Sequence, residues 1–150
     1  MDNVQIIDEL DKEIIKLLSK DGRMAFTEIA SQLNVTEKTV RARYKNLVEN
    51  QILEVVGIVN PISIGVKTSA IIQLGIQANT LENIVNRLRN FKEIRYISLT
   101  SGDYQLLIQV HVHTYDELTE TLKKLNQIEG VTRTNVIVQF EVYKNSFEFL

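Results

Sequence analysis

The chain has 150 residues, enough for one domain or two small ones, and an apolar content of 44% that allows a hydrophobic core. Its 17 Lys and Arg nearly balance 19 Asp and Glu, so any attraction to nucleic acid must come from a local basic patch. The absence of cysteine excludes disulfides and thiol chemistry, and no apolar run approaches the ~20 residues of a transmembrane span, so we expect a soluble, cytoplasmic protein with no membrane partner.

The first predicted element is a helix over residues 6–19. Its apolar positions recur at helical spacing, while acidic and basic residues occupy the other side. These apolar positions are Ile6, Leu10, Ile14, Leu17 and Leu18. Asp21-Gly22 follows, and we expect Gly22 to end the helix as a left-handed C-cap.

Two short helices around a tight turn are predicted next. Residues 27–33 form the first, Asn34 turns the chain in the left-handed conformation, and Thr36 caps the N-terminus of the second, which runs to Asn50. This three-helix segment is the size of a small winged or tri-helical DNA-binding domain.

The last of these helices has an apolar side and a basic side. Val40, Tyr44 and Leu47 fall on one side of it. Lys38, Arg41 and Lys45 fall on another side. An apolar back and a basic front suit a helix that enters the major groove of double-stranded DNA, although a solvated basic face is the simpler alternative.

We predict the DNA contacts from side-chain chemistry. Arg41 is the candidate for a guanine edge, because its fork matches the O6 and N7 atoms, and Lys45 is a candidate for phosphate. Lys38 lies in the same row, and Arg43 lies outside it, where it can flank the groove. Glu37 and Thr36 can reach cytosine or phosphate, with capping the expected role of Thr36.

A β-branched run at residues 52–59 predicts a strand, which Asn60-Pro61 interrupts. We therefore divide the chain into a helix-turn-helix domain (1–53), a strand and linker (54–67) and a second domain (68–150).

The second domain alternates strands and helices. Strands are predicted over residues 68–77, 94–100, 104–113 and 131–143, and helices over 81–90 and 115–126. In the last strand, Val136, Val138, Phe140 and Val142 should share one face. The order βαββαβ is that of a ferredoxin-like unit, so the fold class is α+β.

Two helices cover only one face of a four-stranded sheet. The other face is predicted to carry Ile71, Gln73, Tyr96, Leu107, Gln109, Ile137 and Gln139. This surface is too apolar to remain wet, and the sheet of a second copy is the simplest cover.

His111 and His113 should point to the same side of one strand. A structural zinc site needs four ligands and the chain has no cysteine, so we expect no metal and interpret both as polar residues at a sheet face. The acidic residues fall on amphipathic helices, and no catalytic constellation is predicted.

Five segments in order resemble the leucine-responsive regulatory protein/AsnC (Lrp/AsnC) family of transcription regulators. They are residues 10–23, with the Asp21-Gly22-Arg23 end; the helix-turn-helix at 26–50; Asn60-Pro61; Ser101-Gly102-Asp103-Tyr104; and Ile128-Glu129-Gly130-Val131. The resemblance implies a winged helix-turn-helix joined to a ferredoxin-like, RAM/ACT-like domain that forms dimers, tetramers or octamers and binds an amino acid near the glycine loop, with no other cofactor.

The effector site that the resemblance implies lies in the loop and the start of the last strand. Its candidates are Ser101, Gly102, Asp103, Tyr104, Gln105, Thr132 and Thr134. The chain departs from the family pattern at two positions. Gln51 replaces the usual glycine after the helix, where we expect Asn50 to act as the left-handed cap, and Gln105 replaces an acidic residue (or asparagine) that would face an effector amine.

The sequence thus predicts an effector-responsive, DNA-binding transcription regulator and not an enzyme. Two alternatives remain open. A tetrapyrrole (siroheme-type) decarboxylase would use His111 with Arg95 or Arg133, and a DNA-architectural protein would bind DNA without an effector.

Overall fold

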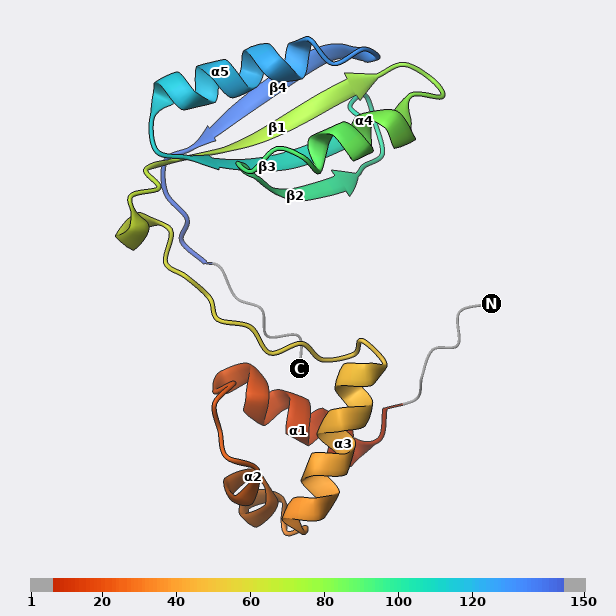
Figure 1. Cartoon of the computed structure of the whole chain (residues 1–150), viewed down its shortest axis with the longest axis vertical. Helices are drawn as coiled ribbons and strands as arrows, with labels where there is room; N and C mark the ends of the chain where they lie inside the picture. The colour runs from red at the N-terminus through yellow and green to blue at the C-terminus, as the bar shows by residue number, and fades with distance from the viewer. Residues whose placement is uncertain (1–6, 145–150) are drawn as a thin grey trace. The chain divides into compact units, whose positions relative to one another are not determined.

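The computed structural model of the chain describes residues 7–144. The chain divides into two compact units, one that contains the first three helices within the residues up to Ile58 and another that covers Val59–Tyr143 (Figure 1). Each unit has its own hydrophobic core. In the part of the chain that is described, no helix has the length and apolar character needed to cross a bilayer.

Helix α1, Glu9–Lys20, begins with a reciprocal capping box. Asp8 accepts a hydrogen bond from the Asp11 N–H at 2.9 Å, and Asp11 accepts one from the Asp8 N–H at 3.2 Å. The helix therefore starts later than the predicted residue 6; Ile6 lies outside the described residues. We predicted Gly22 as a left-handed cap, and this is wrong. The helix ends at Asp21, which has an extended conformation (φ −141°) and accepts a hydrogen bond from the Arg23 N–H through its own carboxylate.

Helices α2, Phe26–Leu33, and α3, Glu37–Glu49, surround the predicted turn. Asn34 has the left-handed conformation (φ 54°, ψ 44°), and the Thr36 hydroxyl accepts a hydrogen bond from the Thr39 N–H at 3.1 Å. Both predictions are confirmed. The core of this unit consists of Ile14, Leu18, Ile29, Ala30, Val40 and Leu47.

The C-terminus of α3 differs from the prediction. Gln51, not Asn50, has the positive φ of 59°, while Asn50 has a φ of −92° and bonds back to the Asn46 carbonyl through its amide nitrogen at 2.7 Å. The Gln51 N–H bonds to the Val48 carbonyl and the Ile52 N–H bonds to the Leu47 carbonyl, at 3.0 and 2.9 Å. This is a Schellman motif, in which glycine is normally preferred at the residue that Gln51 occupies.

Replacing Gln51 with glycine should therefore stabilise the helical unit by about 1 kcal/mol, because a Cβ is unfavourable in the left-handed region. Urea unfolding followed by helical circular dichroism measures this change. Gln51→Ala is the matched control, since it keeps the Cβ and should gain little. Equal stability of the glycine and alanine variants would contradict the assignment.

The predicted strand at residues 52–59 is wrong for the single chain: this segment is irregular. Val56, Ile58 and Val59 are 63%, 70% and 61% exposed. A strand needs a neighbour to pair with, and in residues 7–144 all strand pairing is within the other unit. The segment therefore has a β-branched sequence but no pairing partner, and residues 7–144 contain no wing strand beside the three helices. After Pro61 a short 3₁₀ turn, Ile62–Ile64, leads to the sheet.

The second unit has the predicted βαββαβ order. Its elements are β1 Thr68–Ile76, α4 Leu81–Leu88, β2 Ile94–Leu99, β3 Leu106–Val112, α5 Tyr115–Asn126 and β4 Val131–Gln139. The strands form an antiparallel sheet in the order β2-β3-β1-β4 (Figure 1). The last strand is shorter than predicted: Phe140 and Val142 lie beyond it and are 92% and 57% exposed.

The two faces of this sheet differ in what covers them. One face, with Ala70, Ile72 and Leu74 of β1, packs with side chains of both helices into a core. The alternate residues of each strand point to the other face. There Gln109 donates to Gln139 at 3.1 Å, and Tyr96 and Ile137 are 53% and 46% exposed. Neither α4 nor α5 covers this second face.

Candidate DNA-reading helix and effector loop

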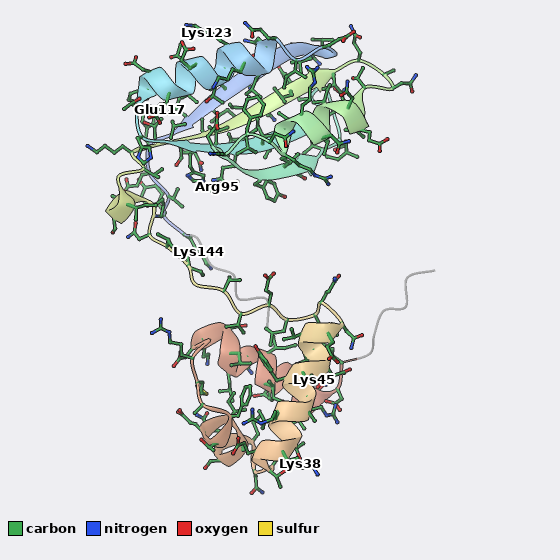
Figure 2. All side chains as sticks on the ribbon, viewed as in Figure 1. Lys38, Lys45, Arg95, Glu117, Lys123 and Lys144 are labelled. Carbon is green, nitrogen blue, oxygen red and sulfur yellow. The ribbon has the colours of Figure 1, made fainter. Side chains whose placement is uncertain are left out.

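Helix α3 packs its apolar side into the unit and exposes its basic side. Val40 and Leu47 are fully buried, and the Tyr44 ring lies 5.0 Å from the Phe26 ring between centroids. Lys38 and Lys45, both labelled in Figure 2, are exposed on the same helix. A helix held by one side after a tight turn is the arrangement with which helix-turn-helix proteins enter the major groove.

Arg41 is exposed and oriented at the same time. Its side chain is 63% exposed, its Nη2 donates to Glu37 Oε1 at 2.6 Å, and its guanidinium lies 5.2 Å from the centroid of the Phe26 ring. An exposed i,i+4 ion pair contributes only about 0.3–0.5 kcal/mol, so a phosphate or a guanine edge can replace Glu37 as the partner. Glu37 therefore holds the fork of Arg41 in place without blocking it.

Arg43 has a structural role that the sequence did not reveal. Its Nη1 donates to Asp8 Oδ2 at 2.6 Å and lies 3.2 Å from Asp11 Oδ2, so it ties α3 to the capping box of α1. The Asp11 N–H and, after it, the Arg43 guanidinium hold the pKa of the Asp8 carboxyl below its ordinary value. Arg43 is thus paired with two carboxylates of the helical unit, and its predicted DNA contact stays a prediction.

The remaining predicted residues keep to the start and outer side of α3. Thr36 is the N-cap, as expected, and Lys45 lies 3.6 Å from Glu49 in a second exposed i,i+4 pair. Lys38, Arg41 and Lys45 thus form the outward basic row, with Glu37 and Glu49 at its margins.

Residues 101–105 form an open loop between β2 and β3. Gly102 has a φ of +96°, and its missing Cβ would meet no atom within 4 Å. The Thr100 N–H bonds to the Gln105 carbonyl at 2.8 Å, and the Thr100 hydroxyl donates to the Tyr104 carbonyl at 2.7 Å. The loop is therefore held at its base while the exposed residues Ser101, Gly102 and Asp103 project from it.

Gln105 binds the backbone of a neighbouring strand. Its side-chain carbonyl accepts a hydrogen bond from the Ile76 N–H at 3.0 Å. Ile76 lies at a bulge, where the register between β1 and β4 shifts after Gly75. The side-chain oxygen that we predicted to face an effector therefore already accepts one hydrogen bond from β1.

Arg133 of β4 reaches the same loop. Its guanidinium stacks 4.6 Å from the centroid of the Tyr104 ring, and its Nη2 donates to the Asp103 carbonyl. The two predicted threonines diverge. The Thr132 hydroxyl lies beside Gly75, whereas Thr134 bonds to Asn126 of α5 at 3.3 Å, so the structure does not bring Thr134 to the loop.

The two histidines have separate partners. His111 Nδ1 lies 2.8 Å from the Ser69 hydroxyl, and burial, followed by the charge of Arg95, lowers the pKa of His111. His113 lies beyond the end of β3, with its Nδ1 2.9 Å from the Gly65 carbonyl. Within residues 7–144 no group of three or more potential metal ligands is present.

Comparison with known families decides the identity of both units. A model described as the AsnC-type helix-turn-helix domain matches residues 7–48, and one described as the Lrp/AsnC ligand binding domain matches residues 69–149. The chain belongs to the Lrp/AsnC family. It is a helix-turn-helix transcription regulator with a ligand-binding domain.

Curated Lrp/AsnC relatives align over almost the whole chain. The regulator LrpA of Pyrococcus horikoshii is 33% identical over 141 residues, 93% of this chain and 100% of that protein. The regulator FL11 of Pyrococcus furiosus is 30% identical over 144 residues, 95% of each chain. Among solved structures, Escherichia coli AsnC has a TM-score of 0.88 at 24% identity, covering 93% of this chain and 96% of that one.

A fold of the same kind has been solved with a ligand. It is a transcriptional regulator of Neisseria meningitidis in complex with L-Met, with a TM-score of 0.88 at 18% identity, covering 95% of each chain. The Lrp/AsnC relatives are regulators and not enzymes, so the tetrapyrrole decarboxylase alternative is set aside. In agreement with this, His111 and Arg133 are engaged at different places, with Ser69 and with the loop.

Proposed function

We propose that this Lrp/AsnC regulator reads double-stranded operator DNA with α3, works as a dimer or a larger even assembly, and responds to a small amino-acid effector at the glycine loop. The observation that carries the DNA-reading part is the division of α3 into a buried side, with Val40 and Leu47, and an exposed basic side.

The residues of α3 divide by chemistry. Arg41 binds a guanine edge, because its planar fork is already oriented by Glu37 and Phe26. Lys38 and Lys45 bind phosphates on either side of it. Thr36 keeps the helix N-terminus in place, where free N–H groups and the helix dipole favour a further phosphate.

A second copy of the chain is the proposed cover of the helix-free sheet face. That face combines exposed Tyr96 and Ile137 with paired amides, as in the Asn135 donation to Gln73 at 2.8 Å. Such a mixed apolar and hydrogen-bonded surface is typical of self-association. Two copies also present two DNA-reading helices, one for each half-site.

Replacing Ile137 with glutamate should therefore shift the protein toward the monomer, because an unpaired charge would be buried in the sheet-to-sheet contact. Light scattering at a fixed concentration measures the mass. Tyr115→Glu is the matched control, since Tyr115 is 61% exposed on α5 and away from this face. An unchanged mass for the Ile137 variant would refute the proposed interface.

The effector part of the proposal rests on the loop and on the fold. The Neisseria regulator with the same fold holds L-Met, and the loop of this chain exposes backbone around Gly102, where a carboxylate can bind N–H groups. An amino acid bound there would change how copies associate and thereby change the spacing of the DNA-reading helices. The proposal requires no cofactor other than this effector.

Fluorescence anisotropy with DNA from the protein's own promoter region tests the function. Each amino acid is titrated at millimolar concentration while light scattering follows the assembly. The proposal expects salt-sensitive binding that at least one amino acid strengthens or weakens. Binding that no amino acid alters would instead support an effector-independent architectural protein, and absence of DNA binding would refute the DNA-reading role.

A further inference from the structure

We propose that Arg133 binds the carboxylate of the effector, and that the site reads this carboxylate and not the ammonium group beside it. The inference rests on the proposed function, because it takes the loop at residues 101–105 as the effector site. It adds the residue that anchors the ligand and the chemical class that the site accepts.

Strand β4, the loop itself and Gly75 of β1 together position Arg133. It comes from β4, it stacks on Tyr104, and it donates to the Asp103 carbonyl. Gly75 of β1 provides the space that the side chain crosses, because a Cβ there would lie 2.6 Å from Arg133 Cγ and 2.9 Å from Nε. An arginine held by an aromatic ring and a neutral carbonyl keeps its full positive charge, and its remaining N–H groups suit a carboxylate.

The acidic counterpart for an ammonium group is weak at this site. Gln105 is neutral, and its side-chain oxygen already accepts the Ile76 N–H at 3.0 Å. The remaining acid of the loop is Asp103, which is exposed and contributes its backbone carbonyl to Arg133. An exposed carboxylate adds little affinity for a cation in water.

The chemistry that fits this arrangement is an organic acid that presents its carboxylate to Arg133. An amino acid and the 2-oxo acid of the same skeleton share the carboxylate and the side chain and differ only at the α-position. A site that reads the carboxylate through Arg133 should bind both members of such a pair with dissociation constants within about threefold.

The test uses the full-length protein and matched ligands. Isothermal titration measures how tightly the protein binds each ligand of two matched pairs. The pairs are leucine and 4-methyl-2-oxopentanoate, and methionine and 4-methylthio-2-oxobutanoate. Leucinamide, which lacks the carboxylate, is measured as well. We expect the protein to bind both members of at least one pair, with dissociation constants within about threefold of each other. We expect no measurable binding of leucinamide. An amino acid bound more than tenfold tighter than its oxo acid would overturn the inference and leave the proposed amino-acid effector standing.

Variants test the anchor separately. Arg133→Gln should weaken both ligands at least tenfold, since it removes a charged hydrogen bond. Gly75→Ala should weaken both as well, because it displaces the Arg133 side chain without changing its chemistry. Arg87→Gln, on α4 and outside the loop, is the control and should change affinity by less than about threefold. Asp103→Asn tests for an ammonium contact and should weaken the amino acid no more than it weakens the oxo acid.

Three other outcomes overturn the inference. One is wild-type affinity in Arg133→Gln, and another is a selective tenfold loss of the amino acid in Asp103→Asn. The third is the absence of binding by every ligand, which would also remove the effector part of the proposed function. DNA binding measured on the same samples distinguishes this last outcome from failure of the DNA-reading role, and retained DNA binding and helical circular dichroism show that the variants are folded.

Discussion

Replacing Arg41 with alanine is expected to weaken binding to a specific operator by about 1–3 kcal/mol while leaving the stability of the chain almost unchanged. The guanidinium is held by Glu37 at 2.6 Å and by the Phe26 ring, so it meets DNA with little loss of side-chain freedom. Its side chain is 63% exposed, so the folded unit loses little packing.

The measurement is anisotropy with the operator and with an unrelated duplex at the same salt concentration. Discrimination between the two should fall, since a base contact carries sequence information and a phosphate contact does not. Lys16→Ala is the matched control, because Lys16 is an exposed cation on α1 with an ordinary surface ion pair to Glu13. Equal operator affinity for Arg41→Ala and wild type would refute the base-contact assignment.

Replacing Asp11 with alanine should destabilise the helical unit by about 2–3 kcal/mol. Asp11 is 4% exposed, closes the capping box of α1 and pairs with Arg43 of α3 at 3.2 Å. Its removal leaves the Asp8 N–H without the carboxylate that closes the capping box, and it leaves Arg43 with one carboxylate in place of two.

Urea unfolding followed by helical circular dichroism measures this loss. Glu13→Ala is the control, since Glu13 lies on the same helix with its side chain 48% exposed and a single weak pair to Lys16. Its effect should stay below about 0.5 kcal/mol. Similar losses for the two variants would show that Asp11 does not join α1 to α3.

Local patterns predicted most of the fold because each element buries one side. The strand β1 alternates Ala70, Ile72 and Leu74 toward the core, and α3 repeats Val40 and Leu47 at helical spacing. Helix caps could also be predicted where a single side chain forms them, as Thr36 does for α3.

Strand predictions failed where pairing was missing. Residues 52–59 and the segment with Phe140 and Val142 have apolar, β-branched or aromatic sequences, but no neighbouring strand pairs with them in the described chain. A strand is stabilised by hydrogen bonds to another strand, which the pattern of a single segment does not contain.

In the candidate sites, too, long-range contacts could not be predicted from the pattern of a single segment. The basic row on α3 follows from spacing alone, whereas the Arg43 pair joins residues 32 and 35 positions apart. Arg133 reaches the loop because the register places it opposite Gly75 at a bulge. Such contacts depend on tertiary packing, so the sequence shows each arginine but not the residues that it contacts.

The salt dependence of operator binding tests the central claim most directly, namely that the exposed row on α3 meets the DNA backbone. The logarithm of the association constant is measured against the logarithm of salt concentration for wild type, Lys38→Ala, Lys45→Ala and the control Lys16→Ala. Replacing either Lys38 or Lys45 with alanine should reduce the magnitude of the slope by about 1 for every subunit in contact with DNA, whereas Lys16→Ala should not change the slope. Slopes that are the same for all four proteins would contradict the account.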